Sequence, residues 1–270
     1  MVVWNFHLRK VHAKCPACRL ASKGRTRTWG TRHDTISSVS DAFPVLEELA
    51  VAIDNYSYPC FVYDFSKNQE INLGSMAAVE RFIGDRLLST DIERVRDGLS
   101  NVLFWGNYNS GYRTYRVDKF RAAVDSQTLR QAVDVFASLQ GCAISDMKRL
   151  KLPGFGCLSF LSKLRTFLDL SAFCVIDLKL RRDIPALKEK FKAYGPKPTS
   201  IPVTQFNEES YGWWVGLCRK TALQMAGEVV RRPVDVERGF FQMVNTKKAD
   251  NADSLIRQLD QKFISHASAF

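Results

Sequence analysis

The sequence has few histidines, no long apolar run and no paired cysteine pattern. Its four histidines include none between residues 34 and 265, so a histidine-based catalytic triad in the core is excluded. No apolar run reaches the roughly 18 residues that a membrane helix needs, and the first residues do not resemble a secretory signal. The seven cysteines are odd in number and mostly scattered, unlike a disulfide framework. We therefore expect a cytoplasmic protein with reduced thiols and no membrane partner.

Positive charge is in excess and is concentrated near the start of the chain. Lys and Arg number 39 against 28 Asp and Glu, which gives a net charge of +11. Residues 1–40 hold eight basic residues and one acidic residue, and so carry seven of these charges. Residues 19–40 lack apolar periodicity and are rich in Ser, Thr, Gly and Arg, which predicts a disordered basic tail over 1–40. An anionic partner is indicated, and nucleic acid is the commonest one.

From about residue 41 the apolar residues recur at helical spacing. Such faces contain Val79, Ile83 and Leu87; Val95, Leu99 and Val102; Leu129, Ala132 and Phe136; Leu161, Leu164 and Phe167; and Leu255, Ile256 and Leu259. Residues 59–64 are the only candidate strand, and three prolines make 195–203 a loop. We expect an all-α domain over 41–270 with eight to ten helices, in one body or two lobes.

One segment, residues 142–168, has the pattern of two helices joined by a tight hairpin. A short amphipathic helix ends near Leu150, and Leu-Pro-Gly154-Phe155-Gly156 separates it from a second helix. The glycines allow unusual backbone angles and close approach of a ligand, and amides at a helix start suit a phosphate. The basic side chains beside this hairpin are Lys148, Arg149 and Lys151. An ordinary connection with a glycine cap is the alternative.

Asp177 follows the second helix of this segment after a short hydrophobic stretch. It lies 21 residues after Gly156, and a basic segment, residues 178–182, comes directly after it. Lys179 and Arg181 in that segment could extend a phosphate-binding surface. Because Asp is a favoured first residue of a helix, Asp177 is also a candidate helix cap.

The hairpin and the position of Asp177 resemble the helix-hairpin-helix DNA glycosylase superfamily, and the spacing is similar to its 8-oxoguanine DNA glycosylase branch. Shorter stretches between residues 80 and 245 also resemble a prokaryotic group with this fold. The resemblance implies a helical fold, double-stranded DNA as the partner in a nucleoid-associated protein, and excision of a damaged or modified base. It implies that the hairpin around Gly154, Phe155 and Gly156 grips DNA and that Asp177 acts in catalysis.

The sequence departs from the family pattern at one catalytic position. Bifunctional members carry a Schiff-base lysine two residues after the second glycine, where this chain has Leu158. The absence of that lysine argues against lyase activity. Lys163 is a second candidate nucleophile, although a rotation of about 100° per residue points it away from the direction of position 158. No cysteine cluster follows the hairpin, so we expect no iron–sulfur cluster and no other cofactor.

A flipped base requires aromatic faces on which to stack. The candidates are Trp105, Tyr108, Phe240 and Phe241, each of which could equally be a core residue. Asp235 and Glu237 could be a metal pair, but the arginines beside them favour an internal ion-pair network. No metal site and no obligate protein partner are predicted.

The interpretation is a DNA N-glycosylase, a hydrolase that flips its target base. Asp177 would stabilise the sugar cation or activate the nucleophile. The alternatives are a non-catalytic helix-hairpin-helix DNA-binding protein of the same fold and a helical interaction protein that binds no DNA.

Overall fold

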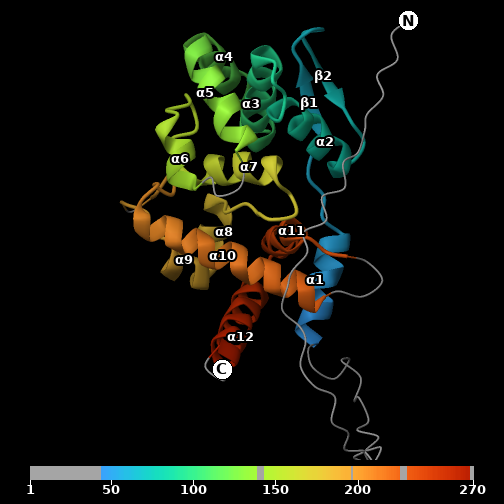
Figure 1. Cartoon of the computed structure of the whole chain (residues 1–270). Coiled ribbons are helices and arrows are strands. Elements are labelled where there is room, and N and C mark those ends of the chain that lie inside the picture. The colour runs from blue at the N-terminus through green and yellow to red at the C-terminus, as the bar shows by residue number, and fades with distance from the viewer. Residues whose placement is uncertain (1–43, 139–142, 196, 226–229, 268–270) are drawn as a thin grey trace, which may run out of the picture. The chain divides into compact units, whose positions relative to one another are not determined.

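The apolar residues at helical spacing fold into helices, as the sequence predicts. The computed structural model describes residues 44–138, 143–195, 197–225 and 230–267, so the tail predicted over 1–40 lies outside the described residues. Within them are twelve helices and one pair of strands (Figure 1): α1 (Pro44–Asp54), β1 (Phe61–Asp64), β2 (Gln69–Asn72), α2 (Met76–Leu87), α3 (Ile92–Gly106), α4 (Arg113–Ala123), α5 (Ser126–Ala137), α6 (Ile144–Arg149), α7 (Leu158–Leu168), α8 (Leu178–Asp183), α9 (Pro185–Lys190), α10 (Gln205–Gln224), α11 (Pro233–Asn245) and α12 (Ala249–Ala267).

The five apolar faces named above belong to α2, α3, α5, α7 and α12, and their side chains are buried in the core. The described residues contain more helices than the expected eight to ten. One reason is that the basic segment after Asp177 divides at Ile184 into α8 and α9. Pro185 occupies the first turn of α9, where its missing amide hydrogen has no cost.

The expectation of an all-α fold is wrong at one place, because the candidate strand has a partner. Residues Phe61–Asp64 pair antiparallel with Gln69–Asn72. The partner strand was missed since only Ile71 in it is apolar, and β2 is mostly exposed. The buried amide of Asn101 on α3 accepts from the Tyr63 amide at 2.7 Å and donates to the Tyr63 carbonyl at 3.1 Å, which ties β1 to α3.

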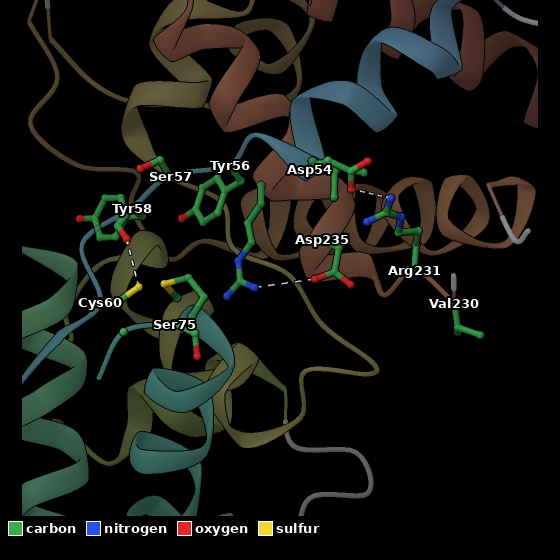
Figure 2. Close-up of a pocket in the computed structure, with 13 residues that line it drawn as sticks. Asp54, Tyr56, Ser57, Tyr58, Cys60, Ser75, Val230, Arg231 and Asp235 are labelled. Carbon is green, nitrogen blue, oxygen red and sulfur yellow. Dashed lines mark hydrogen bonds and ion pairs between the residues drawn. The ribbon is translucent and has the colours of Figure 1, made fainter. Parts of the chain in front are cut away.

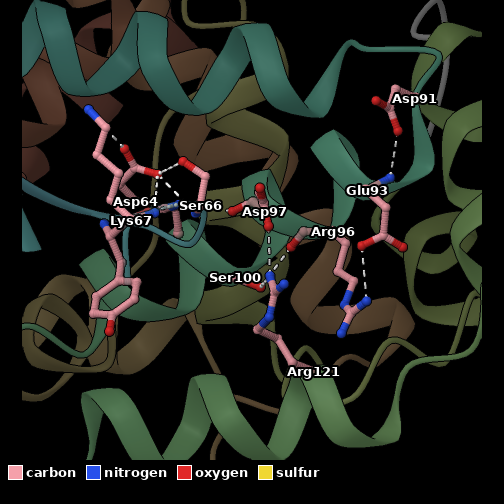
Figure 3. Close-up of polar contacts among 11 residues, drawn as sticks. Asp64, Ser66, Lys67, Asp91, Glu93, Arg96, Asp97, Ser100 and Arg121 are labelled. Atoms are coloured by element: carbon pink, nitrogen blue, oxygen red, sulfur yellow. Dashed lines mark hydrogen bonds and ion pairs between the residues drawn. The ribbon is translucent and has the colours of Figure 1, made fainter. Parts of the chain in front are cut away.

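Polar contacts also hold the turn between β1 and β2 and attach α4 to α3 (Figure 3). Asp64 Oδ1 accepts from the Ser66 amide at 3.0 Å and from its hydroxyl at 2.6 Å. Arg121 on α4 donates to Asp97 at 2.7 Å and to Ser100 at 3.2 Å, both on α3. The inner side of α4 is therefore bound to α3.

Helix α7 occupies a central position. In Figure 1 it runs between the α2–α5 group and the α8–α12 group. Ala42–Phe270 form one compact unit. The predicted loop at 195–203 passes the start of α7, where the Leu158 amide donates to the Ile201 carbonyl at 2.9 Å. Among the described residues, no helix has the length and apolar character to cross a bilayer.

Helices α1 and α11 pack in contact at Gly239, which yields a test of the fold. A Cβ at this position would lie 2.7 Å from side-chain carbons of both Leu49 and Ile53 and 3.3 Å from the Leu49 carbonyl oxygen. We expect Gly239→Ala to lower the free energy of unfolding by about 1–3 kcal/mol through overpacking. Gly216→Ala on α10 is the matched control, because nothing lies within 4 Å of the added carbon. Denaturant melts in which both variants behave alike would contradict this packing.

Candidate active site

Lys163 and Asp177 form an ion pair at the centre of the described fold. Lys163 Nζ lies 2.6 Å from Asp177 Oδ2, and the side chains are 7% and 27% exposed, respectively. The other carboxylate oxygen of Asp177 accepts from the Lys179 amide at 2.8 Å and so caps α8. Both sequence interpretations of Asp177, as a cap and as a site residue, are thus compatible with its geometry. The carboxylate faces solvent in part, whereas the ammonium lies almost wholly beneath the surface.

Three side chains hold the backbone that leads into Asp177. The Tyr211 hydroxyl donates to the Cys174 carbonyl at 2.9 Å, and the Trp214 indole donates to the Val175 carbonyl at 2.8 Å. The Ser162 hydroxyl, one residue before Lys163, accepts from the Ile176 amide at 3.1 Å. All three of these side chains are buried. The relative position of Lys163 and Asp177 is therefore set by hydrogen bonds from α7 and α10, which is the kind of support that preorganises a reactive centre.

The environment of Asp177 favours its ionised form. Burial raises the pKa of the Asp177 carboxyl, but the Lys163 charge and the hydrogen bonds from Lys163 and the Lys179 amide lower it, and the net shift is downward. Near neutral pH Asp177 is thus a carboxylate. Leu158, by contrast, is fully buried in the core and offers no functional group.

Of the two glycines in the hairpin before α7, only Gly154 has the left-handed backbone that the sequence predicts for both, and, among the described residues, nothing lies within 4 Å of a Cβ added at Gly156. Gly154 has a φ of +82°, and its missing side chain leaves room for Leu103, which would lie 3.2 Å from a Cβ. Gly154 and Gly156 are exposed. Phe155 does not contact a ligand through its ring, contrary to the sequence expectation, because it is 2% exposed and packs edge-on against Phe120 at 6.0 Å. Its ring anchors the hairpin in the core.

The basic residues predicted near the hairpin lie in different environments. Lys148, Arg149 and Lys151 are exposed. Lys148 donates to the Val203 carbonyl at 2.9 Å, and Arg149 pairs with Asp146.

The two basic residues predicted on α8 differ from each other. Lys179 is half-buried, donates to Asn245 and lies 5.6 Å from the Phe241 ring centre. The expectation that Arg181 extends a phosphate-binding surface is wrong. Arg181 is 8% exposed and donates to the Phe191 carbonyl at 2.8 Å. The amide of Leu158 is likewise occupied by Ile201, and so is not available to a phosphate.

The four aromatic candidates separate into two pairs. The ring centre of Trp105 lies 4.8 Å from that of Tyr58, and the ring centre of Phe241 lies 6.2 Å from that of Tyr58. Phe240 is fully buried against Trp214, so its expected stacking role is wrong. Tyr108 stacks on Phe61 and donates to Glu70 at 3.0 Å, toward the strands. Trp105 and Phe241 thus share Tyr58 as a neighbour. Trp105 is only 6% exposed, however, so its expected stacking role is wrong as well, whereas Phe241 is half-buried.

Tyr58 connects this aromatic group to a cavity of about 500 Å³ (Figure 2). The Tyr56 and Tyr58 rings lie side by side along one wall, nearly parallel at 9° with centres 6.5 Å apart. Asp235 and the Asp54–Arg231 ion pair lie across from them. Burial, and then the charge of Asp177, raise the pKa of Tyr58. The cavity is the size of a small-ligand site.

Sequence analysis missed Tyr56 and Tyr58. The available signal was a Tyr-Ser-Tyr-Pro run between a helix and a strand, where aromatic side chains have no helical face on which to be buried. A turn-rich segment with two alternate tyrosines can place both rings on one wall.

Buried charges around the site are balanced without Glu237. Arg232 and Arg238 each bind Glu80, at 3.0 and 2.6 Å, and Arg232 also binds Asp235 at 2.7 Å. This confirms the ion-pair interpretation of Asp235. Glu237 is 5% exposed. If it were ionised, it would add a third negative charge to those of Glu80 and Asp235, whose charges already balance the two arginines. Burial, offset in part by Arg238 and Lys163, raises the pKa of Glu237 to about 8.

The described residues contain no group of three or more His, Cys, Asp or Glu side chains that could hold a metal ion. The four free cysteines among them, Cys60, Cys157, Cys174 and Cys218, are half-buried or buried. Comparisons with family models, with curated proteins and with solved structures find no match to this chain.

The raised pKa of Glu237 makes stability depend on pH. A carboxyl whose pKa is higher in the folded state favours folding while it is protonated, so stability falls as pH rises from about 4.5 toward 8. In the wild-type protein this effect lowers the free energy of unfolding by up to about 1.4 kcal/mol per pH unit between about pH 4.5 and 8. We expect Glu237→Gln, whose amide has the shape of the protonated carboxyl, to remove this pH dependence. Urea melts at several pH values measure it, with Glu93→Gln on the surface of α3 as control. A wild-type stability that stays flat from pH 5 to pH 8 would show that Glu237 is ionised.

Proposed function

We propose that this chain is a DNA glycosylase that flips a damaged or modified base out of duplex DNA and cleaves its glycosidic bond. The observation that carries the proposal is the ion pair of Lys163 and Asp177, with its ammonium buried and its carboxylate partly open to solvent. The sequence resemblance supplied Asp177, and the contact with Lys163 adds a second reactive group to it.

Cleavage of an N-glycosidic bond builds positive charge on the sugar, and a carboxylate close to the sugar stabilises that charge. Asp177 is ionised and rigidly held, as this role requires. The nucleophile is either a water oriented by Asp177 or the Lys163 amine. For the amine to form a bond to the sugar C1′, Nζ must first lose a proton, and the Asp177 oxygen 2.6 Å away is placed to accept it.

The cavity beside Tyr58 supports the proposal as a place for the flipped base. Its wall of two nearly parallel tyrosines offers π faces for stacking, and Ser57, Ser75 and Asp235 add polar groups. Lysines and glycines on the exposed hairpin, namely Lys148, Lys151, Gly154 and Gly156, are the groups that we assign to the DNA backbone.

Asp177→Asn is the decisive variant, because Asn also caps helices well and so removes charge while keeping α8. We expect excision of the target base from a panel of modified duplexes to fall by about 10²–10⁴-fold in single-turnover assays, with DNA binding unchanged. Asp125→Asn, which removes the charge from the cap of α5 in the same way, is the matched control.

A Lys163→Met variant identifies the nucleophile. If the amine attacks, borohydride traps a covalent DNA adduct with the wild-type protein and not with this variant; if water attacks, neither protein is trapped. Base release by Asp177→Asn at the wild-type rate would refute the role of Asp177. If the wild-type protein and Asp177→Asn both bind the duplexes and neither releases any base, the non-catalytic DNA-binding function becomes the better supported one.

A further inference from the structure

Helix α4 presents an outward face of aromatic and cationic side chains that the excision site does not use. Tyr112, Tyr115, Arg116 and Lys119, called here the α4 face, recur at the i, i+3, i+4 and i+7 spacing that places residues on one side of a helix. The two tyrosines are 66% and 61% exposed, and the two cations are exposed as well. The opposite side carries Phe120 and the other core residues of α4.

The cations of the α4 face differ from the other arginines of the same helix. Arg113 is held by Glu70 at 2.9 Å, and Arg121 is held by Asp97 at 2.7 Å. Within the described ranges, the side chains of Arg116 and Lys119 take part in no hydrogen bond or ion pair, in contrast to those of Arg113 and Arg121. Two positive charges are therefore available to an anionic partner, and the large exposed rings beside them mark an interaction surface.

Helix α4 packs on the hairpin through its buried side, so the α4 face is on the other side of the helix from this contact. Phe120 of α4 packs edge-on against Phe155, which lies between the two hairpin glycines. Arg121 fastens the inner side of α4 to α3 (Figure 3), and Leu103 of α3 contacts the hairpin at Gly154. These contacts fix α4 to the rest of the fold and leave the α4 face uncovered by the described residues.

We propose that the α4 face binds unpaired nucleotides, stacking bases on Tyr112 and Tyr115 and holding the adjoining phosphates with Arg116 and Lys119. Every base has a π face, so aromatic rings accept unpaired bases of any sequence, while Lys and Arg follow the backbone. In an intact duplex the bases are stacked on one another and their faces are not accessible. The inference rests on the proposed function, because that function identifies the partner as DNA. It does not depend on base excision.

The test uses the full chain and fluorescently labelled oligonucleotides in three forms: single-stranded, fully paired, and paired with a short unpaired bulge. Tyr112→Ala/Tyr115→Ala should weaken binding to the single strand and the bulge by at least about fivefold for each ring. Binding to the fully paired duplex should change by less than about twofold. Tyr194→Ala, which removes an exposed ring on another segment, is the matched control.

The charge variant separates stacking from electrostatics. Arg116→Gln/Lys119→Gln should reduce the slope of log K against log salt for the single strand by about 1.4, as expected for two lost phosphate contacts. The tyrosine variant should leave this slope unchanged. Arg130→Gln/Lys188→Gln removes the same net charge from other exposed positions and should retain the wild-type slope.

The outcomes distinguish this inference from the proposed function. If the tyrosine variant binds all three oligonucleotides like the wild-type protein, or loses affinity for all three equally, the α4 face does not stack unpaired bases. If it behaves as expected while no modified base is ever released, the α4 inference stands and the glycosylase proposal fails. If the wild-type protein binds none of the oligonucleotides, both are overturned.

Discussion

A lysine ammonium that is only 7% exposed requires a carboxylate at close range, and the ion pair of Lys163 with Asp177 meets that requirement. Removing either partner would leave a charge in a poorly solvated place. Because Asp177 also caps α8, the same carboxylate joins two helices. The backbone before it is held by Tyr211, Trp214 and Ser162, so the pair is connected to α10 as well as to α7. The arrangement of the site follows from keeping this one pair satisfied.

A second set of charges joins α2 to α11 and limits what the first can do. Glu80, Asp235, Arg232 and Arg238 balance one another, so the surroundings supply no free cation for Glu237. Its protonated form therefore keeps a second negative charge away from Lys163 and Asp177 near neutral pH. The cavity lined by Tyr56 and Tyr58 is also lined by Asp235 and Arg238 of this second set, so a ligand there would contact charged side chains as well as an aromatic wall.

The position of Asp177 could be predicted because it depends on spacing along the chain, and a hairpin followed by a helix has a nearly fixed length. The contact of Lys163 with Asp177 could not, although Lys163 is a candidate nucleophile from the sequence. Helix rotation correctly separates its direction from that of Leu158, but it does not reveal that the loop before Asp177 approaches α7 from the side that Lys163 faces. Arg181 was misplaced for a related reason. Helix α8 spans only six residues, too few for a periodic pattern to show which side chains point inward.

The sequence by itself determined the helices, the hairpin and the distance from Gly156 to Asp177, because apolar periodicity and glycine placement act through neighbouring residues. The tertiary structure alone decided which side chains meet. Tyr58 contacts Trp105 and Phe241, which lie far from it in the chain, and the packing of the helices decided that Phe155 and Phe240 are buried in the core. Local interactions shape each element, whereas convergence at a site depends on how several elements pack, and that information is distributed over the whole core.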